Sequence, residues 1–203
     1  MSSQRFSIAW HKDGAVLCAR EPTVAELTEC APRLSAWYND EYNGAMMTND
    51  ASMSAADVCA LYQQMSAAGG RQFLLYRDGE LMGDADFRRI GDGAPVRAEF
   101  AIMVGVRSAQ GKGVGTAFSV LLHAFAFQKL GLREIYLTII PENEAGRRCY
   151  KKVGYACDEG PVARSYAEHD TDVAMVLTRE AFLRHHGTVL SQIEISARPE
   201  SPR

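Results

Sequence analysis

The segment whose composition points most directly to chemistry is Gln110-Gly111-Lys112-Gly113-Val114-Gly115-Thr116. It lies between an expected strand and an expected amphipathic helix. A glycine-rich turn in this position leaves backbone N–H groups uncrowded at the positive end of the helix, where phosphate oxygens bind well. Glycine suits the turn because a Cβ atom would hold a ligand away from the backbone, and because such turns often need positive φ angles. The segment therefore predicts a phosphate-binding site.

Two common phosphate-binding motifs do not fit this turn. A nucleotide P-loop has the form G-x-x-x-x-G-K-[ST], but five residues separate Gly105 from Gly111, and Gly113 stands where Ser or Thr is needed. A dinucleotide fingerprint G-x-G-x-x-G would need glycine in place of Thr116. A turn that only packs the helix against the sheet is the remaining alternative.

The elements that must position this turn follow from hydrophobic periodicity and from glycine and proline breaks. The expected order is a strand at 15–20, helices at 23–42 and 54–68, a hairpin at 73–87 that turns at Asp78-Gly79, a strand at 98–106, a helix at 113–129, a strand at 132–140, a helix at 143–152 and a strand at 173–177. Antiparallel strands followed by alternating strands and helices predict a mixed α/β sheet, and a ligand site is expected at its middle.

The composition is that of an ordinary folded protein. The 203 residues suffice for one domain, and 47% hydrophobic with 23% charged residues argue against a disordered or fibrous chain. A formal net charge of −3 gives no general attraction to nucleic acid or acidic lipid, so neither is expected as a partner.

Cysteine usage and the start of the chain point to the cytoplasm. The five cysteines are odd in number and include no C-x-x-C pair, which favours reduced thiols. The five histidines are scattered, so no metal site is expected. No apolar run is long enough to cross a membrane, and the first residues carry no secretory signal.

The glycine turn also resembles the signature of a known family. Gln110-x-x-Gly113-x-Gly115 is similar to the Q/R-x-x-G-x-G/A signature of the GCN5-related N-acetyltransferases (GNAT), in which this turn cradles the pyrophosphate of acetyl-CoA. The segment from Asn143 to Tyr155 resembles the second hallmark of that family, N-x₃–₄-[AS]-x-x-x-Y-x-K-x-G-[FY]. The resemblance covers about residues 71–178, and residues 15–70 agree in element order.

The resemblance implies a fold. It is a single mixed, mostly antiparallel sheet of six or seven strands, with helices on both faces and a splay between the fourth and fifth strands. The domain is expected to span 15–186, and a C-terminal extension to span 187–203, with residues 196–203 disordered.

The resemblance also implies acetyl-CoA as co-substrate. The pantetheine arm of CoA would pair with the exposed edge of the fourth strand at Met103, Val104 and Gly105, where a backbone N–H would face the thioester carbonyl. The residues of the turn expected to contact the cofactor are Gln110, Gly111, Lys112, Gly113, Val114 and Gly115. Asn143 would hydrogen-bond the pantetheine arm, or only cap the helix that follows it.

Two residues are expected to be catalytic. Tyr150 lies seven residues after Asn143, as in the family, and a phenol with a pKa of about 10 can protonate the departing thiolate. The alternative is a core tyrosine. Glu99 is the carboxylate of the fourth strand, and burial would raise its pKa and suit it to act as the base. The alternatives are a glutamate in water or paired with Arg97, and loss of the amine proton to solvent.

The acceptor site is expected on the early helices. Trp37 and Tyr38 stand beside acidic residues, a combination that suits a cationic amine, although an amphipathic helix that only buries its aromatics is the alternative. Trp37 to Asp40 and the helical segment after it are most similar to the subgroup that acetylates ribosomal-protein N-termini. The acidic segment 158–172 is expected to form a rim of this site, or only a solvated face.

These residues together predict an N-acetyltransferase that works by direct attack in a ternary complex. No covalent acetyl relay is expected, because no cysteine sits inside the motifs where a relay would need it, and Cys149, which precedes Tyr150, should point elsewhere on the helix. The acceptor would be a protein N-terminus or a small-molecule primary amine. The alternative is a non-catalytic acyl-CoA-binding sensor. A homodimer is also considered, with residues 188–195 pairing across it.

Overall fold

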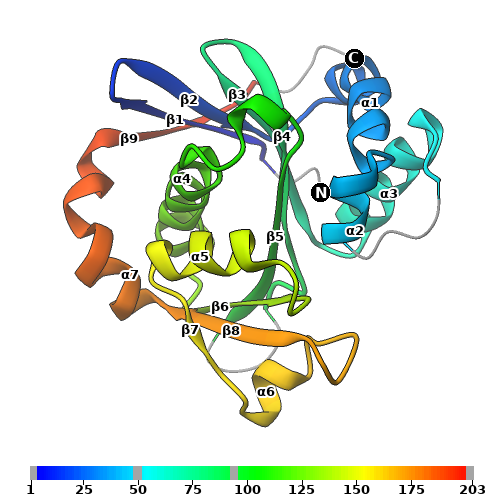
Figure 1. Cartoon of the computed structure of the whole chain (residues 1–203). Helices are drawn as coiled ribbons and strands as arrows, with labels where there is room; N and C mark the ends of the chain where they lie inside the picture. The colour runs from blue at the N-terminus through cyan, green and yellow to red at the C-terminus, as the bar shows by residue number, and fades with distance from the viewer. Residues whose placement is uncertain (1–3, 48–51, 92–95, 200–203) are drawn as a thin grey trace.

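The computed structural model describes residues 4–47, 52–91 and 96–199, and a nine-stranded sheet runs through its centre (Figure 1). The strands are β1 (Phe6–Lys12), β2 (Ala15–Arg20), β3 (Arg71–Arg77), β4 (Glu80–Arg88), β5 (Arg97–Val104), β6 (Glu134–Ile139), β7 (Ala156–Cys157), β8 (Val173–Thr178) and β9 (Ile193–Ala197). Their order is β7-β8-β6-β5-β4-β3-β2-β1-β9, and the neighbours are antiparallel except for β5 and β6. The mixed, mostly antiparallel sheet is confirmed, with more strands than the six or seven expected.

Both ends of the described chain contribute strands that were not expected. β1 precedes the expected first strand and joins β2 through Asp13 and Gly14, whose φ angles of 51° and 78° are those of a tight hairpin turn. β9 pairs with β1 of the same chain. The expected boundary at residue 186 therefore leaves out an edge of the sheet, and Ser196 and Ala197, expected to be disordered, end a strand. Residues 200–203 of that segment lie outside the described residues.

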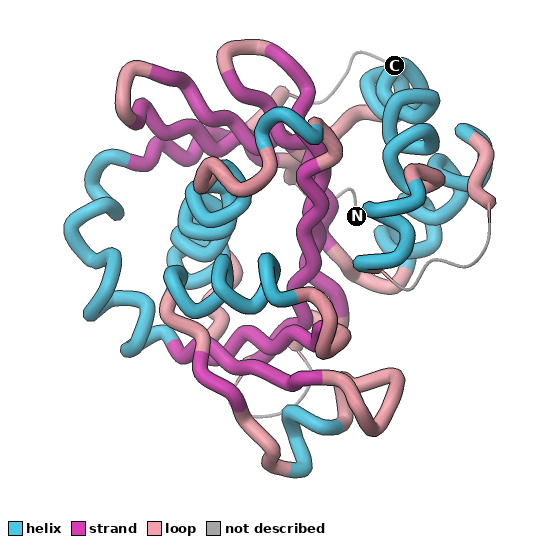
Figure 2. Tube along the Cα trace, viewed as in Figure 1, coloured by secondary structure: helices cyan, strands magenta, loops and turns pink. Residues whose placement is uncertain are grey.

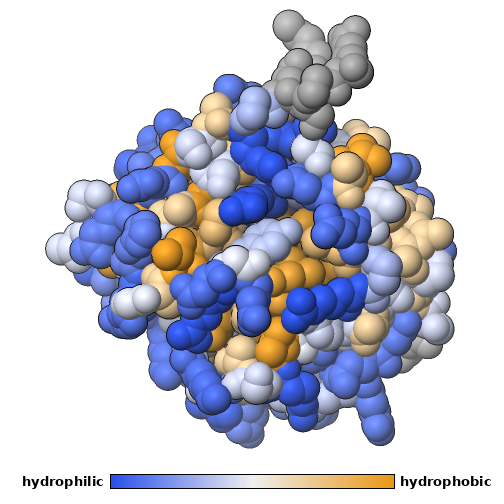
Figure 3. Space-filling view, turned by 90° about the horizontal axis from the view of Figure 1, so that it is seen from above, coloured by the Kyte–Doolittle hydropathy of each residue, from blue (hydrophilic) through white to orange (hydrophobic). Residues whose placement is uncertain are grey.

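Helices cover both faces of the sheet, as expected (Figure 2). They are α1 (Val24–Tyr38), α2 (Glu41–Met46), α3 (Ala55–Ala67), α4 (Val114–Lys129), α5 (Glu144–Val153), α6 (Pro161–Arg164) and α7 (Arg179–His186). α4 packs against β1, β2 and β5 on one face, whereas α3 packs on β3 and α1 packs on α3 at the other. On the face seen from above, apolar residues gather in the middle and are bordered by hydrophilic ones (Figure 3). None of the described helices has both the length and the apolar character needed to cross a membrane.

The strands β5 and β6 separate soon after they begin. Residues 97–99 pair in parallel with residues 134–136, and the pairing then stops, although β5 continues to Val104 and β6 to Ile139. Figure 1 shows the two strands diverging. The expected splay is therefore confirmed. It leaves the second half of β5 without a neighbouring strand on one side among the described residues.

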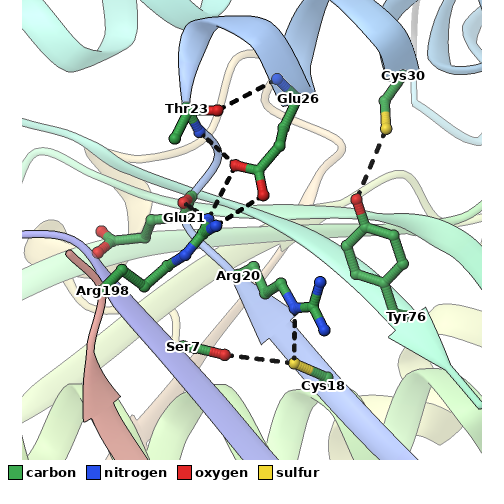
Figure 4. A network of polar contacts seen from close by, with 9 residues as sticks. All are labelled: Ser7, Cys18, Arg20, Glu21, Thr23, Glu26, Cys30, Tyr76 and Arg198. Atoms are coloured by element: carbon green, nitrogen blue, oxygen red, sulfur yellow. Dashed lines mark hydrogen bonds and ion pairs between the residues drawn. The ribbon is translucent and has the colours of Figure 1, made fainter. Parts of the chain in front are cut away.

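The start of α1 is held by residues from distant parts of the chain (Figure 4). Thr23 and Glu26 form a capping box, and Arg198 donates to both oxygens of the Glu26 carboxylate, at 2.6 and 3.0 Å. Arg198 also donates to the carbonyl oxygen of Glu21 at 2.6 Å. Burial alone would raise the pKa of Glu26, but the hydrogen bonds from Arg198 and Thr23 outweigh it and lower this pKa to about 2.

This contact predicts a pH-dependent loss of stability in Arg198→Ala. The folded-state pKa of Glu26 lies below its ordinary value of 4.5, so its stabilisation is present above pH 4.5 and is lost as the pH falls towards 2. The side chain is 32% exposed, and solvent screening limits the effect. We expect a loss of about 1 kcal/mol at pH 7 that shrinks below pH 4, measured by urea unfolding. Removing Arg198 in a Glu26→Gln background should show no such pH dependence; an equal loss at pH 7 and pH 3 in the native background would contradict the assignment.

Candidate active site

A cavity of about 820 Å³ follows the free edge of β5 and receives side chains from both faces of the sheet. Gly113 and Tyr150 line it from the side of α4 and α5, and Tyr62 and Asp84 line it from the side of α1 and α3. Its volume lies in the range of about 300–1,000 Å³ that is usual for ligand sites. The splay therefore forms a passage in which two molecules can meet.

The predicted glycine turn forms one end of this cavity. Gly111 and Gly113 have φ angles of 72° and 82°, and a Cβ atom on either would meet no atom within 4 Å. Gly113 is the N-cap of α4, whose first backbone N–H groups have no partner within the helix. Gly115 also lines the cavity, whereas the side chains of Lys112 and Val114 do not, and Val114 is buried in the core. This end of the cavity suits an anionic group.

The end of β5 presents backbone groups to the cavity. Gly105 donates its N–H to the carbonyl oxygen of Met82 in β4, at 2.8 Å. Because backbone groups alternate along a strand, those of Val104 point the other way, into the splay. The carbonyl oxygen of Val104 accepts a hydrogen bond from Gln110 Nε2 at 2.8 Å, and the same nitrogen donates to Asn43 Oδ1 at 3.0 Å. Gln110 thus ties the glycine turn to β5 and to α2.

The two predicted aromatic residues of α1 differ in their surroundings. Trp37 does not line the cavity. Its ring lies against Gly105, where a Cβ atom would come within 2.0 Å of it. Tyr38 lines the cavity and donates its hydroxyl to Asp84 Oδ2. The packing alternative therefore describes Trp37, and Tyr38 lies in the part of the cavity that Asp84 also lines.

α5 brings the residues of the second hallmark to the cavity. Asn143 caps the helix by accepting from the N–H of Gly146 at 2.8 Å, and its Nδ2 lies 3.4 Å from the carbonyl oxygen of Met46 in α2. Tyr150 is 7% exposed, and its hydroxyl makes no hydrogen bond to any described residue. Burial raises the pKa of the Tyr150 phenol, with smaller contributions from Cys149 and Asp86, so the phenol keeps its proton at neutral pH.

The position of Cys149 differs from the prediction. It was expected to point away from the site, but it lines the same cavity as Tyr150, and Thr116 Oγ1 donates to its sulfur at 3.3 Å. Consecutive helical residues both reach the cavity because α5 lies across the splay. Burial raises the pKa of the Cys149 thiol, despite the opposing effects of Thr116 and Lys152, so the sulfur stays protonated and is a weak nucleophile.

Carboxylates line the opposite end of the cavity. Asp84, Asp86 and Arg88 occupy alternate positions of β4 and so share one face of the sheet, and Arg88 pairs in register with Glu99 of β5. Arg88 Nε donates to Asp86 Oδ1 at 2.6 Å. Burial is the largest effect on the pKa of Glu99 and raises it. The charge of Arg88 lowers this pKa, and the charge of Asp86 raises it further. The ion pair of Arg97 is with Glu134, at 2.9 Å, instead of with Glu99.

The loop before β8 adds further acidic residues. Glu168 and Asp172 line the cavity, so part of the expected acidic rim does face it. Asp172 Oδ2 accepts the backbone N–H groups of Glu168 and His169, and Arg164 donates to the carbonyl oxygen of Asp172 at 2.6 Å. These bonds fix the loop as a wall of the site.

Sequence analysis did not identify the residues that β4 and α3 contribute to this cavity. Asp84 is buried, and its Oδ2 accepts from Tyr62 at 2.8 Å as well as from Tyr38. Burial raises the pKa of Asp84 to about 6, although both phenols lower it. The sequence did carry a signal for this site, because Asp84 and Asp86 interrupt the apolar middle of β4 at alternate positions.

Comparisons with known proteins agree with this geometry. A family model for the acetyltransferase (GNAT) domain matches residues 17–156. Spermidine N(1)-acetyltransferase of Escherichia coli (strain K12) is 25% identical over 169 residues, which are 81% of this chain and 84% of that protein.

Two solved structures share the fold. Mycobacterium smegmatis RimJ in complex with CoA-disulfide has a TM-score of 0.71 at 19% identity and covers 93% of this chain and 96% of its own. Aminoglycoside acetyltransferase AAC(6')-Ib in complex with coenzyme A and kanamycin has a TM-score of 0.66 at 22% identity, covering 83% and 98%. Since the matched domain spans more than half of the chain and contains the glycine turn, the splay and the whole of α5, the protein belongs to the GNAT acetyltransferases.

Proposed function

We propose that this protein transfers the acetyl group of acetyl-CoA to a primary amine of a cationic small molecule, by direct attack in a ternary complex. The observation that carries the proposal is one continuous cavity with an open glycine turn at one end and carboxylates at the other. Acyl transfer of this kind needs an anion site for the CoA, a place for a cationic amine, and a proton donor for the leaving thiolate.

The glycine end fits the CoA moiety. The space at Gly111 and Gly113 would be filled by any Cβ-bearing side chain, and it adjoins the N-terminal amides of α4. Arg148 and Lys152 also line the cavity and can balance phosphate charge. When bound, acetyl-CoA supplies an acetyl group activated as a thioester. The splay-facing backbone of Val104 would hold the arm that carries it.

The carboxylate end fits an amine that is positively charged in solution. Five carboxylate residues line this half of the cavity, and the neighbouring guanidinium of Arg88 is already engaged by one of them. These residues are Asp84, Asp86, Glu99, Glu168 and Asp172. Such a wall attracts an ammonium group and excludes anionic acceptors. Spermidine and aminoglycoside acetyltransferases, by their names, act on amines of this kind.

Tyr150 is the proposed acid, and the direct route is favoured over a covalent relay. The Tyr150 hydroxyl faces the cavity without a protein partner among the described residues, so it is available to protonate sulfur. The thiol of Cys149 keeps its proton because of burial, which makes a covalent acetyl-cysteine step slow. The five cysteines are unpaired, which supports the reducing cytoplasm as the place of action.

The proposal is tested by measuring CoA binding and turnover on the same preparation. Acetyl-CoA should raise the melting temperature, and release of free thiol should be seen with spermidine or kanamycin and be slower with a peptide that begins with alanine. Binding without thiol release on any amine would favour the acyl-CoA sensor instead. Fast turnover of the peptide alone would move the acceptor class to protein N-termini.

A further inference from the structure

We infer, on the basis of the acetyl transfer proposed above, that Asp84 is the base that takes the proton from the ammonium group of the acceptor. Asp84 lines the acceptor half of the cavity from β4, and no feature of the sequence hallmarks includes it. Its place in the sheet, its hydrogen bonds and its neighbours each support this role.

The register of the sheet places Asp84 beside the reacting region. Asp84 pairs with Met103 across β4 and β5, one residue before Val104, whose backbone faces the splay. A thioester held along this edge would therefore lie two strand spacings from the backbone of Asp84, about 10 Å, a distance that the Asp84 side chain and the acceptor amine would span. Glu99 lies four residues before Met103 on β5, about 13 Å along the strand, where β5 is still paired with β6 and the splay is closed.

The hydrogen bonds orient the carboxylate and leave one oxygen available. Tyr38 from α1 and Tyr62 from α3 both donate to Oδ2. Oδ1 accepts no hydrogen bond from the described residues, although the side chain is 6% exposed. Two phenol donors on one oxygen fix the plane of the carboxylate, so that the lone pairs of Oδ1 are the ones left for a ligand.

The groups that face Asp84 tune its basicity. They are the two phenols from the helices and, from its own strand, Asp86 and Arg88; its partners across the sheet, Leu74 and Met103, do not titrate. Burial is the largest effect and raises the pKa of Asp84 to about 6, which the phenols and Arg88 lower and Asp86 raises. The carboxylate is thus ionised at pH 7, yet basic enough to accept a proton.

An N–H bond of the ammonium breaks and the Asp84 Oδ1–H bond forms, which frees the nitrogen lone pair. The nitrogen then bonds to the thioester carbon while the carbonyl electron pair moves to oxygen. When that pair returns, the C–S bond breaks and sulfur takes the proton of Tyr150. The phenolate recovers a proton from the nitrogen, and Asp84 releases its own to solvent, so one proton leaves per turnover.

Three variants, each expected to change the pH dependence of kcat in a different way, test this role. In Asp84→Asn the phenols keep a hydrogen-bond acceptor but the base is gone, so kcat should fall about 10²–10⁴-fold. In a plot of kcat against pH, the rising limb near pH 6 should disappear. Tyr62→Phe removes a donor to the carboxylate, so the limb should move to higher pH. Asp86→Asn removes a negative neighbour, so the limb should move to lower pH.

A second acceptor separates proton removal from structure. An acyl hydrazide is uncharged at neutral pH and needs no base before attack, so the deficit of Asp84→Asn should shrink by about tenfold or more with it. An equal deficit on both acceptors would overturn the inference. So would an intact limb in Asp84→Asn with its loss in Glu99→Gln, which would make Glu99 the base.

The same measurements distinguish a wrong role for Asp84 from a variant that does not fold and from a wrong proposed function. If Asp84→Asn does not fold, the opposite shifts of Tyr62→Phe and Asp86→Asn decide, and unmoved limbs in both overturn the inference. Turnover by the wild-type protein is recorded first. Its absence on every amine would overturn the proposed function, whereas wild-type turnover with an unimpaired, folded Asp84→Asn variant would overturn the role of Asp84 alone.

Discussion

Gly113→Glu should abolish binding of CoA and acetyl-CoA while the protein stays folded. The Cβ of residue 113 would enter open space at the N-terminus of α4, and the carboxylate would occupy the place proposed for the pyrophosphate. An acidic side chain at a helix N-terminus does not oppose the helix, but the φ of 82° costs any L-residue about 1 kcal/mol. We expect the Kd for CoA, measured by calorimetry, to rise by about 100-fold or more.

Gly131→Glu provides the matched control. Gly131 also has a positive φ, 68°, and open space at its Cβ, but it follows the other end of α4 and does not line the cavity. Gly131→Glu should lose at least as much stability as Gly113→Glu, because its carboxylate lies at the negative end of the helix dipole, and only Gly113→Glu should lose CoA. Wild-type affinity in Gly113→Glu would show that the turn does not hold phosphate.

Tyr150→Phe should lower turnover by about 10²–10⁴-fold without lowering stability or acetyl-CoA affinity. The substitution keeps the ring and removes the proposed proton donor. Because the Tyr150 hydroxyl makes no hydrogen bond within the described part of the chain, its loss leaves no buried partner unsatisfied. The loss of rate should be larger for thioesters whose thiolate leaves poorly. Turnover and melting temperature are to be measured on one preparation.

Tyr155→Phe gives the opposite pattern and serves as its control. The Tyr155 hydroxyl lies 2.5 Å from Nε2 of His123 in the core, and burial lowers the pKa of that histidine to about 3, so the neutral ring accepts the bond. Removing this hydroxyl should cost about 1–3 kcal/mol of stability and leave turnover per folded molecule near that of the wild type. Unchanged turnover in Tyr150→Phe would remove this tyrosine from the mechanism.

Local signals explain which elements of the fold were predictable. The Asp78-Gly79 hairpin turn has positive φ at both residues, 51° and 84°, and Ser54 forms the expected capping box with Asp57 at the start of α3. The long helix expected at 23–42 is broken, because Asp40 caps a separate α2. The Asp13-Gly14 turn carried the same hairpin signal as Asp78-Gly79, so β1 could have been recognised. β9 could not, because its place depends on pairing with a strand far away in the sequence.

In the site, too, features set by local sequence could be predicted, and features set by contacts between distant segments could not. The glycine turn and Tyr150 were predicted because each belongs to a short segment whose spacing carries its chemistry. The role of Trp37 as packing for Gly105 could not be seen, since it requires the crossing of α1 over the end of β5. The Asp84 cluster joins β4, α1 and α3, and the distance between Tyr38, Tyr62 and Asp84 in the chain hides their contact.

The two outermost strands of the sheet, β7 with two residues and β9 with five, have a consequence for behaviour at high concentration. An edge strand offers unpaired backbone groups on which another molecule can add a strand, and a short edge offers few. Loss of β9 would expose residues 6–10 of β1, which include buried Ile8 and Trp10, as a new edge. Because the C-terminal segment covers this edge, we expect a chain shortened before residue 193 to self-associate more readily than the full chain.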